Sequence, residues 1–270
     1  MTDNQLVYLY CVANEEPKLA KAVDLAEDLY LVCHRALHAV VGEVDESEFG
    51  AEGLKRNMAD LEWIKTNASA HEKVIEQAMI NTDVIPFKFG TLFATDESLK
   101  MMLEQHGEEF KAILERLANK QEWGLKIYCD LEKLRTGLLS SQERILKIDN
   151  EIKSSSVGKA YLLKKKKDEM IEQTLNERIN KCGRESFESL KESSCEARIN
   201  RLLPKEVTER EDEMVLNSAF LVGKDKVGNF IDVVDTLKMR YEQDGLFVDC
   251  TGPWPAYNFC GLSDGRRQNE

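Results

Sequence analysis

The chain has 270 residues, a length that predicts two domains, each large enough to bury a hydrophobic core of its own. Its 37 Lys and Arg residues against 49 Asp and Glu residues give a net charge of −12, which argues against a nucleic-acid partner. No stretch approaches the roughly 20 apolar residues of a membrane span, and the polar residues 1–5 do not resemble a signal peptide. We therefore expect a cytoplasmic protein with no membrane partner.

The N-terminal part, residues 1–130, is expected to form an α+β domain. Strands are predicted at residues 6–13, 29–35, 36–44, 84–87 and 122–129. The first three alternate only weakly between apolar and polar residues, which favours central strands. Helices are predicted at about residues 50–60, at 68–80 and from Asp96, where Thr95 or Asp96 can cap the helix and an apolar stripe continues to Leu117.

Residues 131–192 differ from the N-terminal part in composition and pattern, and they predict a helical hairpin. This segment has no proline and forms two helical blocks, 131–153 and 157–190, separated by three serines, of which Ser156 is the expected N-cap. The apolar stripe of the second block is thin and interrupted by charge. Such a stripe is typical of a projecting helix pair that could bind a partner at its tip.

Residues 193–262 are assigned to a C-terminal α+β domain packed with the hairpin, and residues 263–270 to a disordered tail. Strands are predicted at 197–200, 213–222 and 245–251, and a helix at 227–241. The fold class is thus α+β, with two α+β domains and a helical hairpin between them or inserted in the second. Ferredoxin-like elements are expected in at least one domain.

A rigid aromatic turn follows the last predicted strand. Pro253 and Pro255 restrict the backbone on both sides of Trp254, directly after Gly252, and Tyr257 and Phe259 follow. We expect these aromatic side chains to cover the core of the second domain. The alternative is an exposed docking site.

A second aromatic block begins at Pro86 and ends at Phe93. Phe87 and Phe89 flank Lys88, and Gly90 permits a backbone turn that a side chain would disfavour. We expect Phe87, Phe89 and Phe93 to fill the core between the sheet and the helix from Asp96. The alternative is that residues 88–91 face a partner.

Candidate chemistry is sparse along the chain. Gly158-Lys159 lacks the other residues of a phosphate-binding loop, and His34 and His38 lie in a predicted strand and turn with only Cys33 nearby. We expect His71 and His106 to be solvated on polar helix faces. The seven cysteines are scattered singly and indicate reduced, buried thiols. We therefore predict no catalytic, cofactor-binding or metal-ligating residues, no cofactor and no enzymatic activity.

Several blocks, in order along the chain, carry a family resemblance. The ending Gly252-Pro253-Trp254-Pro255-Ala256-Tyr257 resembles the terminal signature of the gas vesicle protein GvpL/GvpF family, with Ala256 where the family pattern has a further proline. The block Val84–Phe93 and the segments 122–127, 158–162 and 217–222 are similar to further family blocks. The resemblance covers about residues 6–260.

The resemblance implies a non-catalytic gas vesicle accessory or minor structural protein, located in the cytoplasm and at the gas vesicle. Its partners would be the hydrophobic shell protein and other accessory proteins during vesicle assembly, with self-association also open. The alternative is a cytosolic enzyme or a regulatory ligand-binding module, which would need a deep polar pocket with a perturbed acid or base. The candidate partner-binding or structural residues are Pro86, Phe87, Phe89, Gly90, Gly252, Pro253, Trp254, Pro255, Tyr257 and Phe259.

Overall fold

The computed structural model describes residues 5–19 and 29–261 and divides into two compact units. The first unit comprises residues 1–122 together with 253–270, and the second comprises residues 123–252. These units differ from the expected boundaries at 130 and 192. Most of the strand Lys120–Cys129 belongs to the second unit, where it pairs with that unit's strands, and the segment after Gly252 returns to the first.

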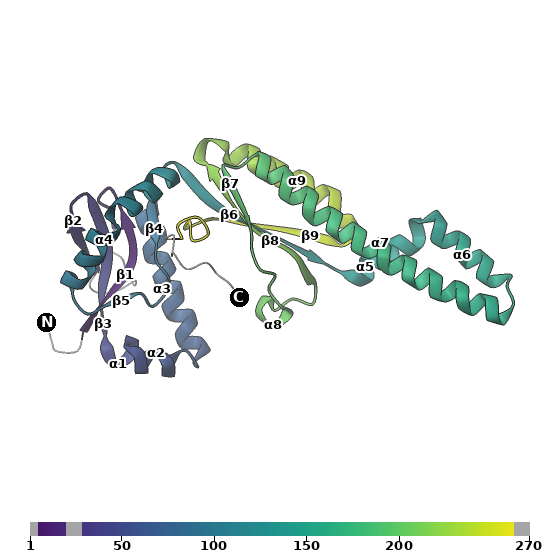
Figure 1. The fold of residues 1–270 in the computed structure, drawn as a ribbon, viewed down its shortest axis with the longest axis horizontal. Coiled ribbons are helices and arrows are strands. Elements are labelled where there is room, and N and C mark those ends of the chain that lie inside the picture. Colours follow the sequence, from purple (N-terminus) through teal and green to yellow (C-terminus); the bar gives the residue numbers. More distant parts are fainter. Residues whose placement is uncertain (1–4, 20–28, 262–270) are drawn as a thin grey trace. The chain divides into compact units, whose positions relative to one another are not determined.

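The first unit is built on an antiparallel sheet (Figure 1). Its strands follow the order β2-β3-β1-β4, and β5 also pairs with β1; their bounds are β1 Gln5–Ala13, β2 Leu29–His34, β3 Leu37–Asp45, β4 Val84–Pro86 and β5 Leu92–Phe93. β1 is central and buried from Val7 to Ala13. β2, which the sequence pattern assigned to the middle of a sheet, instead lies at the edge of the described strands.

Helices cover both faces of this sheet. They are α1 Glu46–Phe49, α2 Ala51–Asn57, α3 Leu61–Met79 and α4 Asp96–Leu117. The predicted cap of α4 is confirmed, because the Thr95 and Ser98 side chains each accept from the other's backbone N–H. α3 begins seven residues earlier than expected, since the Asp60 carboxylate accepts hydrogen bonds from two N–H groups of its first turn.

The second unit contains a four-stranded sheet in the order β7-β8-β6-β9. The strands are β6 Lys120–Cys129, β7 Glu196–Ile199, β8 Glu213–Gly223 and β9 Leu246–Trp254, and the helices are α5 Leu131–Ser141, α6 Glu143–Lys153, α7 Val157–Glu192, α8 Lys205–Thr208 and α9 Val227–Tyr241. Short 3-10 turns occupy Lys224–Lys226 and Glu242–Asp244. The α+β fold class is therefore confirmed.

The predicted hairpin consists of α5, α6 and the long helix α7. From Ile171 onward, α7 contributes Ile171, Leu175, Cys182 and Leu190 to the core of the second unit, together with Ile145 of α6. The free end of the α6–α7 pair extends away from the sheet (Figure 1). Ser156 occupies the N-cap position of α7, but its side chain makes no capping hydrogen bond.

Two further observations concern the described residues. None of their helices is long and apolar enough to cross a membrane. All seven cysteines are free thiols, but Cys33 and Cys195 are exposed, so the expectation of buried thiols is wrong for these two.

Candidate functional site

The Pro86–Phe93 block and the aromatic turn after Gly252 meet in the first unit, although Phe93 and Gly252 are 159 positions apart in the chain (252 − 93 = 159). The Pro86–Phe93 block continues along β1, where the Phe87 N–H donates to the Tyr10 carbonyl and the Leu9 N–H donates to the Thr91 carbonyl, each over 2.9 Å. Gly90 has a φ of +79°, the left-handed conformation that its lack of a side chain permits. The C-terminal turn contacts the start of this block, where the Cys260 thiol lies 3.8 Å from the Pro86 carbonyl oxygen.

Phe87 and Phe89 point into different environments. Phe87 packs edge-on against Phe110 of α4, with ring centroids 5.9 Å apart, as expected for a core residue beneath that helix. Phe89 instead contacts the rings of Tyr8, Trp63 and His71 on the α3 side. The expectation that both rings fill the space under α4 is therefore wrong for Phe89. Phe89 belongs to the turn at Gly90, which connects β4 with β5 and is not part of either strand.

A buried histidine lies at the centre of this region. His71 of α3 is only 4% exposed, which overturns the expectation of a solvated side chain. Three aromatic rings contact it directly, those of Tyr8, Tyr10 and Phe89. Phe49 and Trp63 pack against these rings in turn, and we call the whole group the His71 cluster: Tyr8, Tyr10, Phe49, Trp63, His71 and Phe89. The spacing of His71 with Val74, Ile75 and Ala78 marks the buried face of α3, and this pattern could have revealed it from the sequence.

His71 lies in a chain of hydrogen bonds that begins at the Gly90 N–H and ends at the Glu72 carboxylate. The Gly90 N–H donates to the Tyr8 hydroxyl over 3.0 Å, and the Tyr8 hydroxyl lies 3.0 Å from His71 Nδ1. His71 Nε2 lies 3.0 Å from the Phe87 carbonyl oxygen and 3.2 Å from the Tyr257 hydroxyl, which donates to Glu72 over 3.2 Å. A neutral imidazole with its proton on Nε2 satisfies this arrangement, since Nδ1 then accepts from Tyr8.

The electrostatics of the cluster agree with that neutral state. Burial lowers the pKa of His71, and the hydrogen bond to the Phe87 carbonyl only partly opposes this effect. Burial also raises the pKa of Tyr10 to about 12 and raises the pKa values of Tyr8 and Tyr257, so all three phenols stay protonated. The Glu72 pKa is raised, chiefly by burial.

The C-terminal turn is anchored at two further points. Glu122, 4% exposed, accepts hydrogen bonds from the Asn258 backbone N–H over 2.9 Å and from its side-chain amide over 2.6 Å. Phe259 is fully buried, and its carbonyl accepts a hydrogen bond from Arg116 at the end of α4. Pro255 is also buried. These contacts hold residues 255–260 in the first unit.

Trp254 behaves differently from the aromatic residues that follow it. Gly252, Pro253 and Trp254 form the exposed end of β9, and the Trp254 side chain remains 39% exposed. The expectation that residues 252–259 cover the core of the second domain is therefore wrong. Phe259 and Tyr257 pack on the first unit because the Asn258 contacts turn the chain toward Glu122.

The His71 cluster forms one wall of an open groove. The groove measures about 200 Å³ and is lined by Tyr8, Tyr10, Val44, Phe49, Asn67, Ala70, His71 and Phe89. Most of these side chains are aromatic or aliphatic, and Asn67 donates its amide hydrogen to the Trp63 carbonyl within the same helix. The groove therefore suits an apolar side chain of a binding partner. We call it the aromatic groove.

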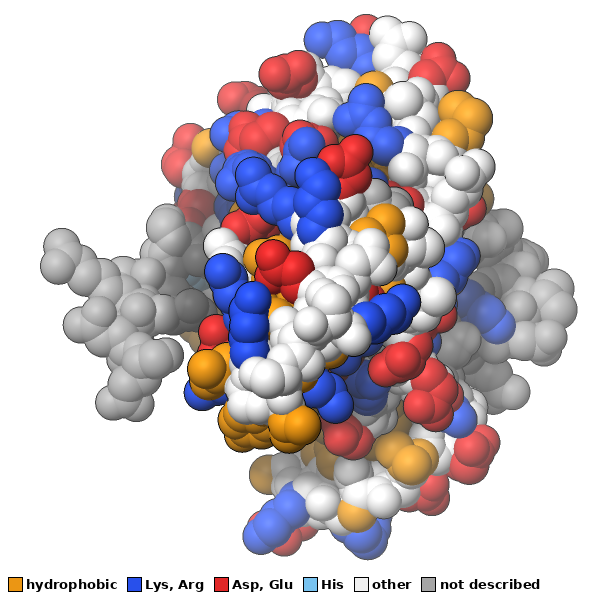
Figure 2. All heavy atoms as spheres, turned by 90° about the vertical axis from the view of Figure 1, so that its right-hand side faces the viewer, with side chains coloured by type: hydrophobic (Ala, Val, Ile, Leu, Met, Phe, Trp, Pro, Cys, Tyr) orange, Lys and Arg blue, Asp and Glu red, His pale blue; other side chains and the backbone are white. Residues whose placement is uncertain are grey.

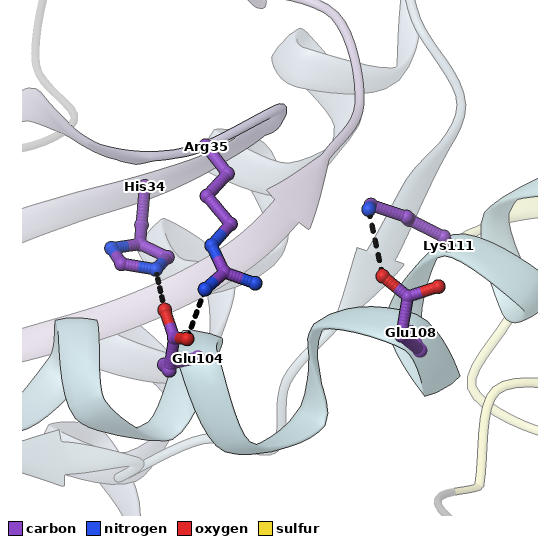
Figure 3. Close-up of polar contacts among 5 residues, drawn as sticks. All are labelled: His34, Arg35, Glu104, Glu108 and Lys111. Atoms are coloured by element: carbon purple, nitrogen blue, oxygen red, sulfur yellow. Dashed lines mark hydrogen bonds and ion pairs between the residues drawn. The ribbon is translucent and has the colours of Figure 1, made fainter.

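His34, the other histidine of interest, belongs to an ion-pair group on the surface. Figure 3 shows His34 and Arg35 both directed at Glu104 of α4, while Glu108 accepts from Lys111 over 2.9 Å. His38 lies 3.4 Å from the Cys33 thiol instead, so the two histidines do not converge. Within residues 5–19 and 29–261, no group of three or more His, Cys, Asp or Glu side chains could hold a metal ion.

The comparisons with known proteins agree with one another. The family model described as gas vesicle synthesis protein GvpL/GvpF matches residues 6–261. Gas vesicle protein L of a Streptomyces species is 26% identical over 268 residues, covering 98% of this chain and 96% of that protein. Gas vesicle protein L1 of Halobacterium salinarum is 26% identical over 261 residues, covering 93% of this chain and 89% of that protein.

A solved structure shows the same fold. The crystal structure of gas vesicle protein GvpF from Anabaena sp. PCC7120 superposes with a TM-score of 0.73 at 18% identity, covering 96% of this chain and 99% of that chain. The family match extends over nearly the whole chain and includes both aromatic motifs. The chain therefore belongs to the GvpL/GvpF family of gas vesicle synthesis proteins, which takes part in gas vesicle formation.

Proposed function

We propose that this protein is a non-catalytic accessory or minor structural protein that binds the hydrophobic shell protein and other accessory proteins while the gas vesicle is assembled. The aromatic groove carries the proposal. Its walls of Tyr8, Tyr10, Phe49 and Phe89 offer an apolar surface with few polar groups, which suits the side chains of a very hydrophobic partner. Both aromatic motifs of the family support this groove through the hydrogen bonds of His71.

The state of His71 supports binding rather than catalysis. A general base needs a nitrogen that can reach a substrate proton, whereas both His71 nitrogens already have partners in Tyr8, Phe87 and Tyr257. The lowered pKa of His71 and the raised pKa of Tyr8 keep both groups neutral. Such a cluster holds a surface in shape without offering a reactive group.

The overall charge fits the same role. A net charge of −12 helps to keep a complex with an aggregation-prone partner in solution. The groove is apolar, whereas the chain as a whole carries a net negative charge, so binding of the shell protein and solubility of the complex depend on different features of the molecule.

Filling the groove tests the proposal. Ala70 lines the groove from α3, whereas the neighbouring Ser69 is exposed on another face of that helix. We expect Ala70→Trp to reduce co-purification of co-expressed gas vesicle shell protein at least about tenfold, as loss of a central contact does. Ser69→Trp should bind the shell protein as the unaltered chain does. Equal binding by both variants, with unchanged melting temperatures, would refute a role for the groove.

A further inference from the structure

The first turns of α7 expose apolar side chains on one face. Val157, Tyr161 and Leu162 are 89%, 71% and 66% exposed. The opposite face of the same turns packs toward α6, where Lys167 forms an ion pair with Asp149 at 2.6 Å. An apolar group of this kind, left open on one side of a paired helix, is typical of a contact surface.

Unpaired lysines border this apolar group. Lys159, Lys164, Lys165 and Lys166 are exposed, and none forms an ion pair with a carboxylate in the described part of the chain. Lys165 follows Tyr161 by four positions and Lys166 follows Leu162 by four, so these lysines extend the same helix face. We call residues 157–166 the hairpin tip. Figure 2 looks onto this end of the molecule and shows Lys and Arg side chains beside hydrophobic ones.

The loop between β7 and β8 has the opposite charge. Taken with the last residue of β7 and the first residue of β8, this segment comprises residues 199–213, in which Ile199, Leu202 and Val207 are 65%, 48% and 61% exposed. Four exposed carboxylates of this loop form no ion pair with a described basic residue: Glu206, Glu209, Glu211 and Glu213. Arg210 is used within the loop, because it pairs with Asp212 at 2.8 Å. We call this segment the acidic loop.

The hairpin tip and the acidic loop cannot meet within one molecule. Gly183 of α7 lies so close to β8 that a Cβ at this position would be 3.8 Å from the Val215 carbonyl oxygen. Val157 precedes Gly183 by 26 residues, which places it about 39 Å farther along the helix at 1.5 Å per residue. The acidic loop joins β8 at Glu213, two residues before Val215, and Figure 1 shows α8 away from the free end of α7.

We propose that this chain binds a second copy of itself head to tail, with the hairpin tip of one copy on the acidic loop of the next. Both surfaces combine exposed apolar side chains with unpaired charges, and the charges have opposite signs. Because the two surfaces differ, each added copy leaves one tip and one loop free, so the contact builds an open row or a closed ring. This self-association goes beyond shell-protein binding and does not depend on it.

The apolar side chains and the charges should contribute differently to this contact, and the difference can be tested. Exposed ion pairs contribute little free energy and are screened by salt, so the apolar side chains provide most of the affinity and the charges determine which surfaces pair. We expect sedimentation velocity to show a mass that grows with protein concentration at low salt. The dissociation constant should rise several-fold as the salt concentration approaches 0.5 M, where the screening length is only about 4 Å.

Charge reversal identifies the surfaces. The tip variant carries Lys164→Glu, Lys165→Glu and Lys166→Glu, and the loop variant carries Glu206→Lys, Glu209→Lys and Glu211→Lys. Each should stay monomeric alone, whereas an equimolar mixture should associate again, since each tip then finds a loop of opposite charge. A control with Lys55→Glu, Lys73→Glu and Lys100→Glu has the same net charge as the tip variant but lies in the first unit, and it should associate like the unaltered chain.

Several outcomes would overturn the proposal. One is an unaltered chain that stays monomeric at every protein concentration in low salt. This outcome counts against the proposal also if the monomer binds vesicles of anionic phospholipid instead of a second copy. Another is association that survives in the loop variant but not in the tip variant, because the tip would then pair with itself. A mixture of the two variants that remains monomeric also contradicts it. Shell-protein binding by the Ala70→Trp and Ser69→Trp variants is read separately, so the two proposals can fail independently.

Discussion

At the residue scale, two aromatic side chains of the C-terminal motif differ sharply in how much of their surface is exposed. Phe259 is fully buried in the first unit, whereas Trp254, five residues earlier, is 39% exposed. The two hydrogen bonds from Asn258 to the buried Glu122 carboxylate fix the turn between them. Family motifs rich in aromatic residues can therefore contain both a core residue and a surface residue.

This difference predicts unequal effects of truncation. Phe259→Ala should lower the free energy of unfolding by about 3–5 kcal/mol, because it leaves a cavity in a closed core. Trp254→Ala should cost about 1 kcal/mol or less, as for a partly solvated side chain. Urea denaturation of the two variants gives the comparison. A Trp254→Ala variant that loses as much stability as Phe259→Ala would contradict the assignment.

The buried His71 predicts a dependence of stability on pH. Its pKa in the folded chain is lowered, so below pH 6.5 the unfolded chain binds a proton that the folded chain does not. Stability should therefore fall as the pH drops from 6.5, by at most about 1.4 kcal/mol per pH unit for one proton. Protonation would also set an Nδ1 proton against the hydroxyl proton of Tyr8.

Urea denaturation at pH 7.5, 6.5 and 5.5 measures this slope, and His71→Gln supplies the control because Gln does not titrate. Glu72 acts in the opposite sense, since its raised pKa makes stability increase as the pH falls through its folded value. Both chains retain Glu72, so the difference between them isolates His71. Identical slopes in the two chains would show that His71 does not control the acid sensitivity.

At the scale of elements, α7 is one helix with two environments. From Ile171 onward it places residues in the core of the second unit, whereas its first turns contact mainly α6. A hairpin that projects from a domain and a helix that covers a sheet are thus continuous here. The thin apolar stripe seen in the sequence reflects this division, because each half buries a different amount of surface.

Hydrogen exchange should resolve the two halves. Few buried contacts lower the free energy of local opening, so amides of residues 143–168 should exchange faster than those of β8. Amides of residues 171–190 should be protected to a degree closer to β8. Uniform protection along the whole of α7 would contradict this division.

At the scale of the whole molecule, the two units differ in whether they are formed by one segment of the chain or by two. The second unit is one continuous segment, whereas the first needs residues that return after Gly252. The returning turn adds Phe259 to the buried core and hydrogen bonds to His71, Glu72 and Glu122. Folding of the first unit therefore depends on the far end of the sequence.

Fragments test this dependence. A fragment of residues 120–252 should fold cooperatively alone, because it contains every strand of its sheet apart from the last two residues of β9. A fragment of residues 1–122 should be much less stable, and joining residues 253–261 to it through a flexible linker should restore a cooperative melting transition. A fragment 1–122 that melts like the linked version would show that the returning turn is dispensable.

Local pattern and motif were sufficient to predict much of this protein. The capping residues and apolar stripe of α4, the bounds of α9 and the strand β8 all depend on residues a few positions apart, so the sequence alone indicated them. The resemblance to the family was recognised from short sequence blocks, each of which can be identified from a few consecutive residues. The α+β class followed from the mixture of these elements.

Only the tertiary structure decided which of these elements and side chains come together. The edge position of β2, the pairing of β6 with the second sheet and the burial of His71 depend on residues far apart in the chain. His71 contacts Tyr8 across 63 positions and Tyr257 across 186, and Asn258 reaches Glu122 across 136. Periodicity within a helix or strand carries no information on such partners, because burial at these positions is set by whichever distant segment packs against them.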